Sequence, residues 1–81
     1  MQLRYGSEAD AIFLTLRVAE GGEAGGQRLD DTRVAHLDQA GQVFAYEFLC
    51  VSRGVSLAGI DTEDAGHIRE AIQPAIQLAV H

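Results

Sequence analysis

The apolar residues of this chain change their spacing near residue 60, and this change constrains the fold more than any other feature. Before that point they alternate with other residues over short runs, as in 11–17 and 43–49, which is the period of a β-strand. From Asp61 they recur every three or four residues, the period of an amphipathic helix, at Ala65, Ile68, Ile72, Ile76 and Val80. Hairpin-connected strands followed by one helix predict an α+β domain, with the helix covering one face of an antiparallel sheet.

The chain of 81 residues is long enough for one small domain, and no linker or internal repeat divides it. We predict a β-sheet region over 1–49, a link over 50–60 and a helix over 61–80. Asp61 is the expected N-cap, because a carboxylate there accepts hydrogen bonds from the free amides of the first turn. Pro74 lies inside the helical pattern, where it removes a backbone hydrogen bond and clashes with the preceding turn, so we expect a kink or a restart there.

Small and oxygen-bearing residues mark the turns of the expected sheet. Segment 6–10 should join a short strand at 3–5 to the strand at 11–17, and the pair of aspartates at 30–31 should close a second tight turn. Segment 18–27 contains four glycines and little that can be buried, so it is expected to be a mobile loop.

The third turn leads into the strand at 43–49, whose two faces differ. Asp38 and Gly41 have the spacing of a hairpin with a bulge. The aromatic residues that follow alternate with smaller or charged ones, so the core face is expected to be Phe44, Tyr46 and Phe48. The opposite face should stay mildly apolar and open to a partner, and its candidate interface residues are Phe13, Val43, Ala45 and Leu49. With an unpaired strand edge, this face predicts a homodimer or, as the alternative, a complex with a different protein.

Charge and composition restrict the partner and the compartment. Twelve acidic residues oppose six arginines, lysine is absent, and the net charge is −6, so this surface repels the phosphates of nucleic acids. A basic partner protein fits the charge better, although net charge also serves solubility alone.

No apolar run suits a membrane span, no signal peptide is visible, and the single Cys50 can form no internal disulfide. We therefore expect a cytoplasmic protein.

Dispersed positions in the first 60 residues match a known pattern. They comprise a tyrosine, a turn and Glu-Ala-Asp-Ala before a strand (Tyr5 and 8–11), an acidic turn (30–31), a second hairpin (Asp38, Gly41, Val43, Glu47 and Leu49) and a link (52–55 and Leu57). In these residues the chain resembles the YuzE-like family of small domains of unknown function. The resemblance implies a small antiparallel sheet with a helix, no established activity, and a partner-binding or antitoxin-like role. Thr32, His36 and Cys50 depart from the family's usual residues, so no metal-binding role is carried over to them.

Glu8 and Asp10 are the candidate site carboxylates. Two positions apart around a turn, they could hold a cation or act as an acid/base pair, and with His36 they define the alternative function, a metal-assisted hydrolase. Turn chemistry explains them without catalysis, because an aspartate before a strand accepts hydrogen bonds from turn amides.

The other titratable residues have similarly plain interpretations. His67, with Glu63 and Glu70 nearby in the helical pattern, is typical of an exposed helix face, because a metal ion needs three or four converging ligands. Cys50 after an apolar strand is typical of a small buried residue, although with His36 it could suggest a nucleophile and its base. We therefore expect a domain without catalytic residues, cofactor or metal that acts through protein–protein association.

Overall fold

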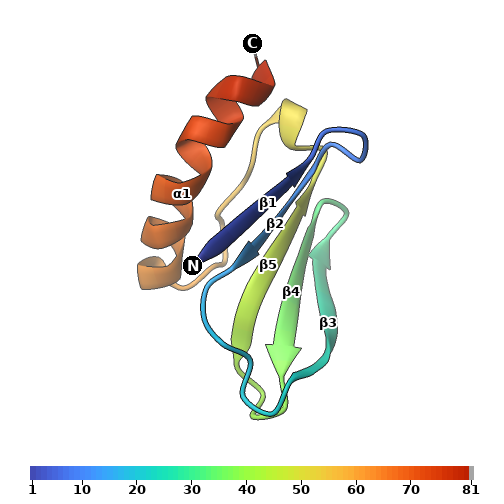
Figure 1. The fold of residues 1–81 in the computed structure, drawn as a ribbon, viewed down its shortest axis with the longest axis vertical. Coiled ribbons are helices and arrows are strands. Elements are labelled where there is room, and N and C mark those ends of the chain that lie inside the picture. The colour runs from blue at the N-terminus through green and yellow to red at the C-terminus, as the bar shows by residue number, and fades with distance from the viewer. Residues whose placement is uncertain (81) are drawn as a thin grey trace.

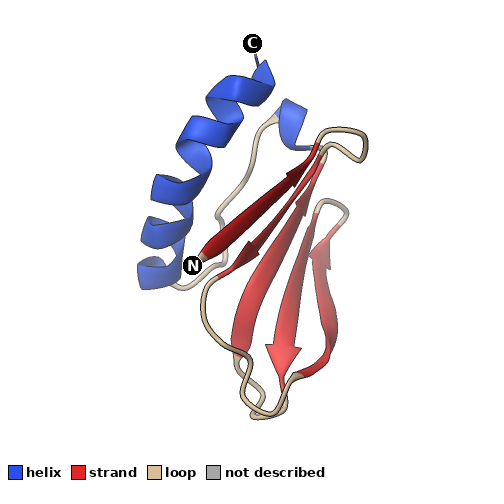
Figure 2. Cartoon of the chain, viewed as in Figure 1, coloured by secondary structure: helices blue, strands red, loops and turns tan. Residues whose placement is uncertain are grey.

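The computed structural model describes residues 1–80, with the side chains of 1–74, and it shows one antiparallel sheet with one long helix beside it (Figure 1). The elements are β1 (Gln2–Gly6), β2 (Ala11–Thr15), β3 (Glu23–Asp30), β4 (Arg33–Asp38), β5 (Val43–Leu49), a short 3₁₀ turn η1 (Val51–Arg53) and α1 (Thr62–Val80). The five strands lie in the order β1-β2-β5-β4-β3, and every neighbouring pair is antiparallel. The predicted α+β class is confirmed (Figure 2).

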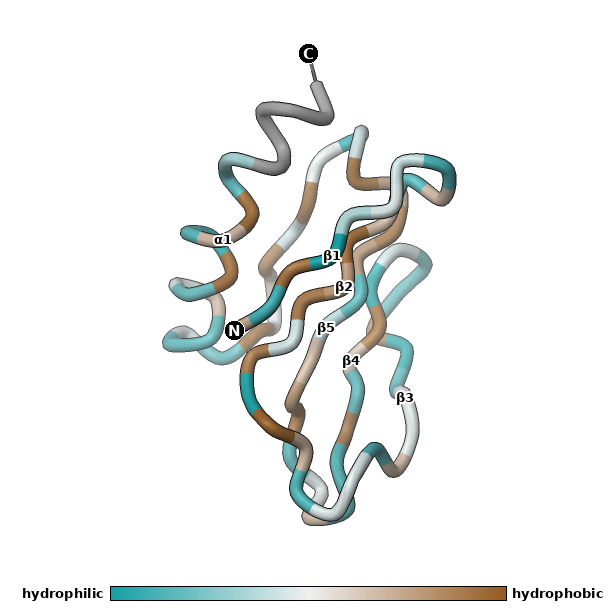
Figure 3. Tube along the Cα trace, in the orientation of Figure 1, coloured by the Kyte–Doolittle hydropathy of each residue, from teal (hydrophilic) through white to brown (hydrophobic). Residues whose placement is uncertain are grey.

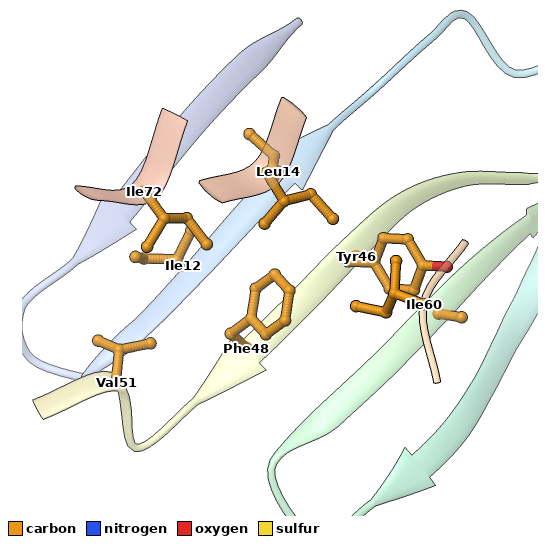
Figure 4. Packing of buried hydrophobic residues seen from close by; sticks show 9 residues of the cluster. Ile12, Leu14, Tyr46, Phe48, Val51, Ile60 and Ile72 are labelled. Carbon is orange, nitrogen blue, oxygen red and sulfur yellow. The ribbon is translucent and has the colours of Figure 1, made fainter. Parts of the chain in front are cut away.

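The core is built from the central strands and the first turns of α1. Ile12 and Leu14 of β2 lie opposite Phe48 and Tyr46 of β5, and all four side chains are buried. The same cluster takes in Ala35, Val51, Ile60, Ile68 and Ile72 (Figure 4). Apolar colouring in Figure 3 accordingly follows β2 and the inner side of α1, whereas most of β3 is pale or hydrophilic. The alternation in β2 and the helical stripe thus predicted the core correctly as far as Ile72; the side chains of Ile76 and Val80 are outside the described residues.

The helix begins where the sequence predicts. One carboxylate oxygen of Asp61 accepts hydrogen bonds from the backbone amides of Glu63 at 3.2 Å and Asp64 at 3.3 Å, which confirms it as the N-cap. The helix then continues through Pro74 without a break, so a restart there is wrong. Burial of Ile68 and Ile72 in the core holds the turns directly before the proline, which helps the helix to tolerate the lost hydrogen bond.

A bulge in β5 reverses the faces predicted for its first two residues. His36 of β4 pairs with Ala45, but the next residue, Leu37, pairs with Val43, so Phe44 is an extra residue on β5. Val43 consequently packs against the core. The ring of Phe44 lies 6.5 Å from the His36 ring, centroid to centroid, and does not join the core cluster. The prediction was therefore wrong in placing Phe44 on the core face and Val43 on the opposite one.

The glycine-rich segment does not form the predicted long loop. Residues 23–30 pair with β4 as the edge strand β3, and only 18–22 forms a connection. That connection is tied down, since the Gln39 amide donates to the carbonyls of Glu20 at 3.1 Å and Gly22 at 3.2 Å. All residues of β3 are exposed, so a glycine there loses little buried side-chain surface compared with a larger residue. Backbone pairing with β4 therefore determines the conformation of β3.

Both predicted aspartate turns are confirmed. Asp30 accepts hydrogen bonds from the Thr32 amide at 3.0 Å and the Arg33 guanidinium at 2.9 Å, and the guanidinium, followed by the amide, holds the pKa of Asp30 below its ordinary value. At the next hairpin Asp38 is buried, and Gly41 has a φ of 85°, a left-handed conformation that favours glycine. The carboxylate of Asp38 accepts the amides of Gln42 at 2.9 Å, Glu20 at 3.2 Å and Ala40 at 3.0 Å.

Candidate functional site

The candidate carboxylates Glu8 and Asp10 lie in the turn between β1 and β2. The Asp10 carboxylate accepts hydrogen bonds from the Ser52 amide at 3.0 Å and the Ser52 hydroxyl at 2.6 Å, and its backbone carbonyl accepts the Val51 amide at 3.0 Å. Asp10 has a φ of 52°, which aspartate tolerates better than most residues. Asp10 therefore fastens η1 to the β1–β2 turn. Glu8 is exposed, and no described side chain bonds to it.

The residues of the hydrolase alternative are not brought together. His36 lies level with Ala45 and Thr15, at the far end of β2 from Asp10. Within residues 1–74, where side chains are described, no three histidine, cysteine, aspartate or glutamate side chains form a group suited to a metal ion. The carboxylate of Asp10 is instead occupied by Ser52. The geometry of these residues thus supplies no observation that favours metal-assisted hydrolysis.

His36 occupies a position that the sequence did not reveal, because it connects the edge strand β3 to the centre of the sheet. Its Nδ1 lies 3.0 Å from Oε2 of Glu23, its Nε2 lies 3.2 Å from Oε1 of Glu47, and its ring centroid is 4.9 Å from that of Phe13. Only a protonated imidazole can donate to both carboxylates at once. Glu23 and Glu47 are 13 and 11 positions from His36 in the chain, and the group depends on the extension of the β3–β4 pairing back to Glu23, which was not predicted.

The candidate interface is less open than predicted. On the sheet face away from α1, Ala45 is completely buried, and Phe13 and Leu49 are partly buried. Val43 packs on the opposite side, with the core. In the described part of the chain the exposed large apolar side chains lie elsewhere, at Met1, Tyr5, Val18 and Leu29. Three of these four belong to, or directly precede, the two edge strands.

The β1 edge of the sheet has fewer protective features than the β3 edge: it has no bulge, and Arg4 is its one charged residue. All five residues of β1 pair with β2 in an unbroken register, and they include neither proline nor lysine. Natural edge strands are usually protected by bulges, prolines or charges, because an unprotected edge can pair with another chain. β3, at the other edge, has two register irregularities and carries Glu23, Arg28 and Asp30. β1 is therefore the edge more open to another strand.

A cleft of about 640 Å³ opens beside the first turn of α1. Its lining combines the apolar side chains of Met1, Leu16 and Val43 with Tyr46 and the charged groups of Arg17, Asp61, Glu63 and Asp64. One guanidinium nitrogen of Arg17 forms an ion pair with Asp64 at 2.6 Å, and another donates to the Val43 carbonyl. Burial raises the pKa of the Tyr46 phenol, and the Asp64 carboxylate adds to this effect, while Arg17 opposes it. No local pattern in the sequence indicates this cleft, because only the docking of α1 brings its residues together.

Two further predicted positions are on the surface. Cys50 is exposed, which contradicts the expectation of a buried cysteine, and its φ of 54° shows the reason: the chain turns sharply there between β5 and η1. His67 is exposed on α1, as expected, and lines the cleft on the same side as Glu63.

Comparisons with known proteins assign no family to this chain. A scan against protein-family models gave no match, and searches of curated proteins and of solved structures gave no significant match. The resemblance to the YuzE-like family therefore stays a prediction. Among the described residues, no helix has the combination of length and apolarity needed to cross a membrane.

Proposed function

We propose that this chain acts by protein–protein association and that β1 pairs with β1 of a second copy. The observation that carries this proposal is the regular, bulge-free edge of β1, where Met1 and Tyr5 are 64% and 42% exposed beside the partly buried Leu3. An exposed strand edge offers a row of unpaired amides and carbonyls to another strand, and the exposed side chains supply apolar surface to bury.

The three apolar residues share one face of the sheet. Leu3 lies opposite Leu14, and Tyr5 lies opposite Ile12, so both side chains are on the face that carries the core and α1. The alternation of a strand places Met1 on the same face, and Met1 lines the cleft beside α1. The edge therefore has an apolar row on its helix side.

Symmetry restricts the register of the proposed dimer. A two-fold axis perpendicular to the sheet makes the two β1 strands antiparallel and leaves both helices on the same face. An axis through Leu3 places Leu3 opposite its own copy, Met1 opposite Tyr5, and Gln2 opposite Arg4. An axis through Arg4 would place two guanidinium groups directly opposite each other, which destabilises a strand pair. The Leu3-centred register is therefore favoured.

Such a dimer is small and should be weak. A five-residue strand pair buries less than a standard interface, so we expect a dissociation constant of about 1–100 μM. β3 and the acidic surface stay free in this arrangement, which leaves room for a basic partner protein and suits the antitoxin-like role that the YuzE-like resemblance implies. A cytoplasmic location is part of the proposal, supported by the single cysteine.

Sedimentation velocity across a concentration series of about 1–500 μM tests the proposal. The wild-type chain should dimerise, and Tyr5→Lys should weaken the dimer at least tenfold, because it places a charge against Met1 of the second copy. Leu29→Lys is the matched control, since Leu29 is equally exposed (41%) on the opposite edge and should have little effect. A wild-type chain that stays monomeric throughout would overturn the proposal. Dissociation by Phe13→Glu but not by Tyr5→Lys would move the interface to the sheet face.

A further inference from the structure

We propose that the cleft beside the first turn of α1 binds an organic cation, namely a guanidinium or ammonium group on an aliphatic stem. This site can bind without strand pairing at β1, although Met1 belongs to both surfaces. Three features carry the proposal: the charge of the cleft, an unpartnered hydroxyl in its wall, and the apolar surface beside that hydroxyl.

The side chains that line the cleft carry an excess of negative charge. Three carboxylates, those of Asp61, Glu63 and Asp64, face the guanidinium of Arg17 and the N-terminal ammonium of Met1, which leaves one negative charge in excess. Asp64 is already paired with Arg17, and Asp61 caps the helix, so Glu63 is the carboxylate without a described partner. The positive end of the helix dipole amounts to only about half an elementary charge and does not cancel this excess. An anion would also find the Arg17 donors occupied by Asp64 and Val43.

Tyr46 provides an independent sign of a ligand. Its side chain is only 6% exposed, and it lines the cleft. No described group bonds to its phenolic oxygen, and that oxygen is not among the fully enclosed polar atoms, so it is open to solvent in a residue that lines the cleft. Figure 4 shows it directed away from Leu14 and Phe48. A tyrosine buried this deeply usually has a hydrogen-bond partner, and here a ligand N–H can fill that position.

The remaining walls suit an aliphatic stem. Met1, Leu16 and Val43 supply apolar contact next to the charged rim, and the volume of about 640 Å³ lies within the range typical of small-ligand sites. A bare metal ion is a poorer fit, because no three candidate ligands converge in the described part of the chain. The combination of apolar wall, hydroxyl and carboxylate matches the chemistry of an arginine or lysine side chain.

An NMR titration of the ¹⁵N-labelled full chain tests this proposal. The probe is N-acetyl-arginine methylamide, and its neutral isostere, N-acetyl-citrulline methylamide, is the control ligand. The arginine compound should shift the backbone signals of residues 61–67 in a saturable manner at millimolar concentration, and the citrulline compound should bind at least about tenfold more weakly. The titration is repeated on Tyr5→Lys, so that the cleft is tested whether or not the chain dimerises.

Variants assign the binding to the cleft. Glu63→Gln and Tyr46→Phe should each weaken binding by about three- to tenfold, because each removes one polar contact. Glu70→Gln is the matched control: it makes the same charge change at an exposed position of α1 outside the cleft, and it should change affinity less than about twofold. Glu63 is exposed, so its variant keeps the test valid even if Tyr46→Phe perturbs folding.

Three results would overturn the proposal: no saturable shift up to about 50 mM, equal binding of the citrulline compound, or an equal loss in Glu63→Gln and Glu70→Gln. The last result would show general charge attraction without a site.

A second arm of the experiment distinguishes two sources of the same cation. Tighter binding of the capped peptide acetyl-Gly-Arg-Gly-amide than of n-butylguanidinium, a free alkylguanidinium of the same charge, supports the side chain of a partner protein, and the reverse order supports a free small molecule.

Discussion

Replacing Asp10 with alanine removes two separate contributions to stability. The carboxylate accepts hydrogen bonds from the amide and the hydroxyl of Ser52, and because both groups are partly open to water we assign each bond about 1 kcal/mol. The φ of 52° adds about 1 kcal/mol, because alanine disfavours the left-handed conformation. The expected loss for Asp10→Ala is therefore about 3 kcal/mol, a large part of the total stability of a domain of this size.

Two further substitutions separate these contributions. Asp10→Gly also loses both bonds but accepts the positive φ without strain, so it should cost about 2 kcal/mol. Asp10→Asn keeps an oxygen for the Ser52 amide and tolerates the left-handed conformation, so it should cost about 1 kcal/mol or less. The expected order of stability is wild type, Asn, Gly and then Ala.

Thermal and urea unfolding followed by circular dichroism measure the series. For a domain of this size 1 kcal/mol corresponds to roughly 4–8 °C in Tm, so Asp10→Ala should melt at least about 12 °C below wild type. Ser52→Ala completes a double-mutant cycle, which should give a coupling energy of about 1 kcal/mol for the hydroxyl bond. An alanine variant that melts within about 2 °C of wild type would refute the reasoning. If that variant also lost a measurable hydrolytic activity, the metal-assisted hydrolase would become the better hypothesis.

Three other perturbations test different parts of the fold. The amide of Gln42, with three others, holds the pKa of Asp38 below its ordinary value of 3.8. The stability that the Asp38 carboxylate contributes is therefore present above pH 3.8 and is lost as the pH falls through the lower folded-state pKa. In Asp38→Asn, the free energy of unfolding measured in urea should therefore fall less steeply than in wild type as the pH decreases from about 5 to 2. An equally steep fall in the variant would contradict this. Gly21→Ala should lower the free energy of unfolding by about 1–2 kcal/mol in thermal melts, because φ is 74° and the new methyl group would lie 3.0 Å from Cβ of Gln39. Gly22→Ala has open space around the new methyl group and should lower it less. Pro74→Ala should raise stability by about 1–3 kcal/mol and increase the helical circular dichroism signal, since α1 already runs through that position, and a loss of stability would argue against a continuous helix.

Local patterns explain which parts of the fold the sequence predicted well. The cap at Asp61 and the stripe through Ile68 and Ile72 depend on residues within one or two turns, so the sequence shows them directly. The turn at Asp38 is equally local, because its carboxylate accepts hydrogen bonds from the amides of Ala40 and Gln42, two and four residues further along the chain. The bond from the Glu20 amide is the exception.

The errors all involve pairings between distant segments. The bulge that moves Phe44 away from the core exists only because β4 and β5 differ by one residue in their register, and alternation within β5 cannot show it. Residues 23–26 look like a flexible loop until β4 offers them backbone partners. Asp10 was recognised as a turn residue, but its partner Ser52 is 42 positions away, so its role in fastening η1 could not be inferred.

Met1 links the two proposed surfaces. It is the first residue of the apolar row at the β1 edge, and it also lines the cleft. Figure 1 shows the N-terminus near the first turns of α1. In the Leu3-centred dimer, Tyr5 of the second copy lies opposite Met1 and adds an aromatic ring beside the cleft, where aromatic rings attract organic cations. Dimerisation should therefore tighten cation binding, and by thermodynamic linkage saturating cation must tighten the dimer by the square of that factor, because each dimer has two clefts. Sedimentation of the wild-type chain with saturating N-acetyl-arginine methylamide measures this tightening of the dimer, and a dissociation constant that is unchanged or increased would show that Met1 does not couple the two sites in this way.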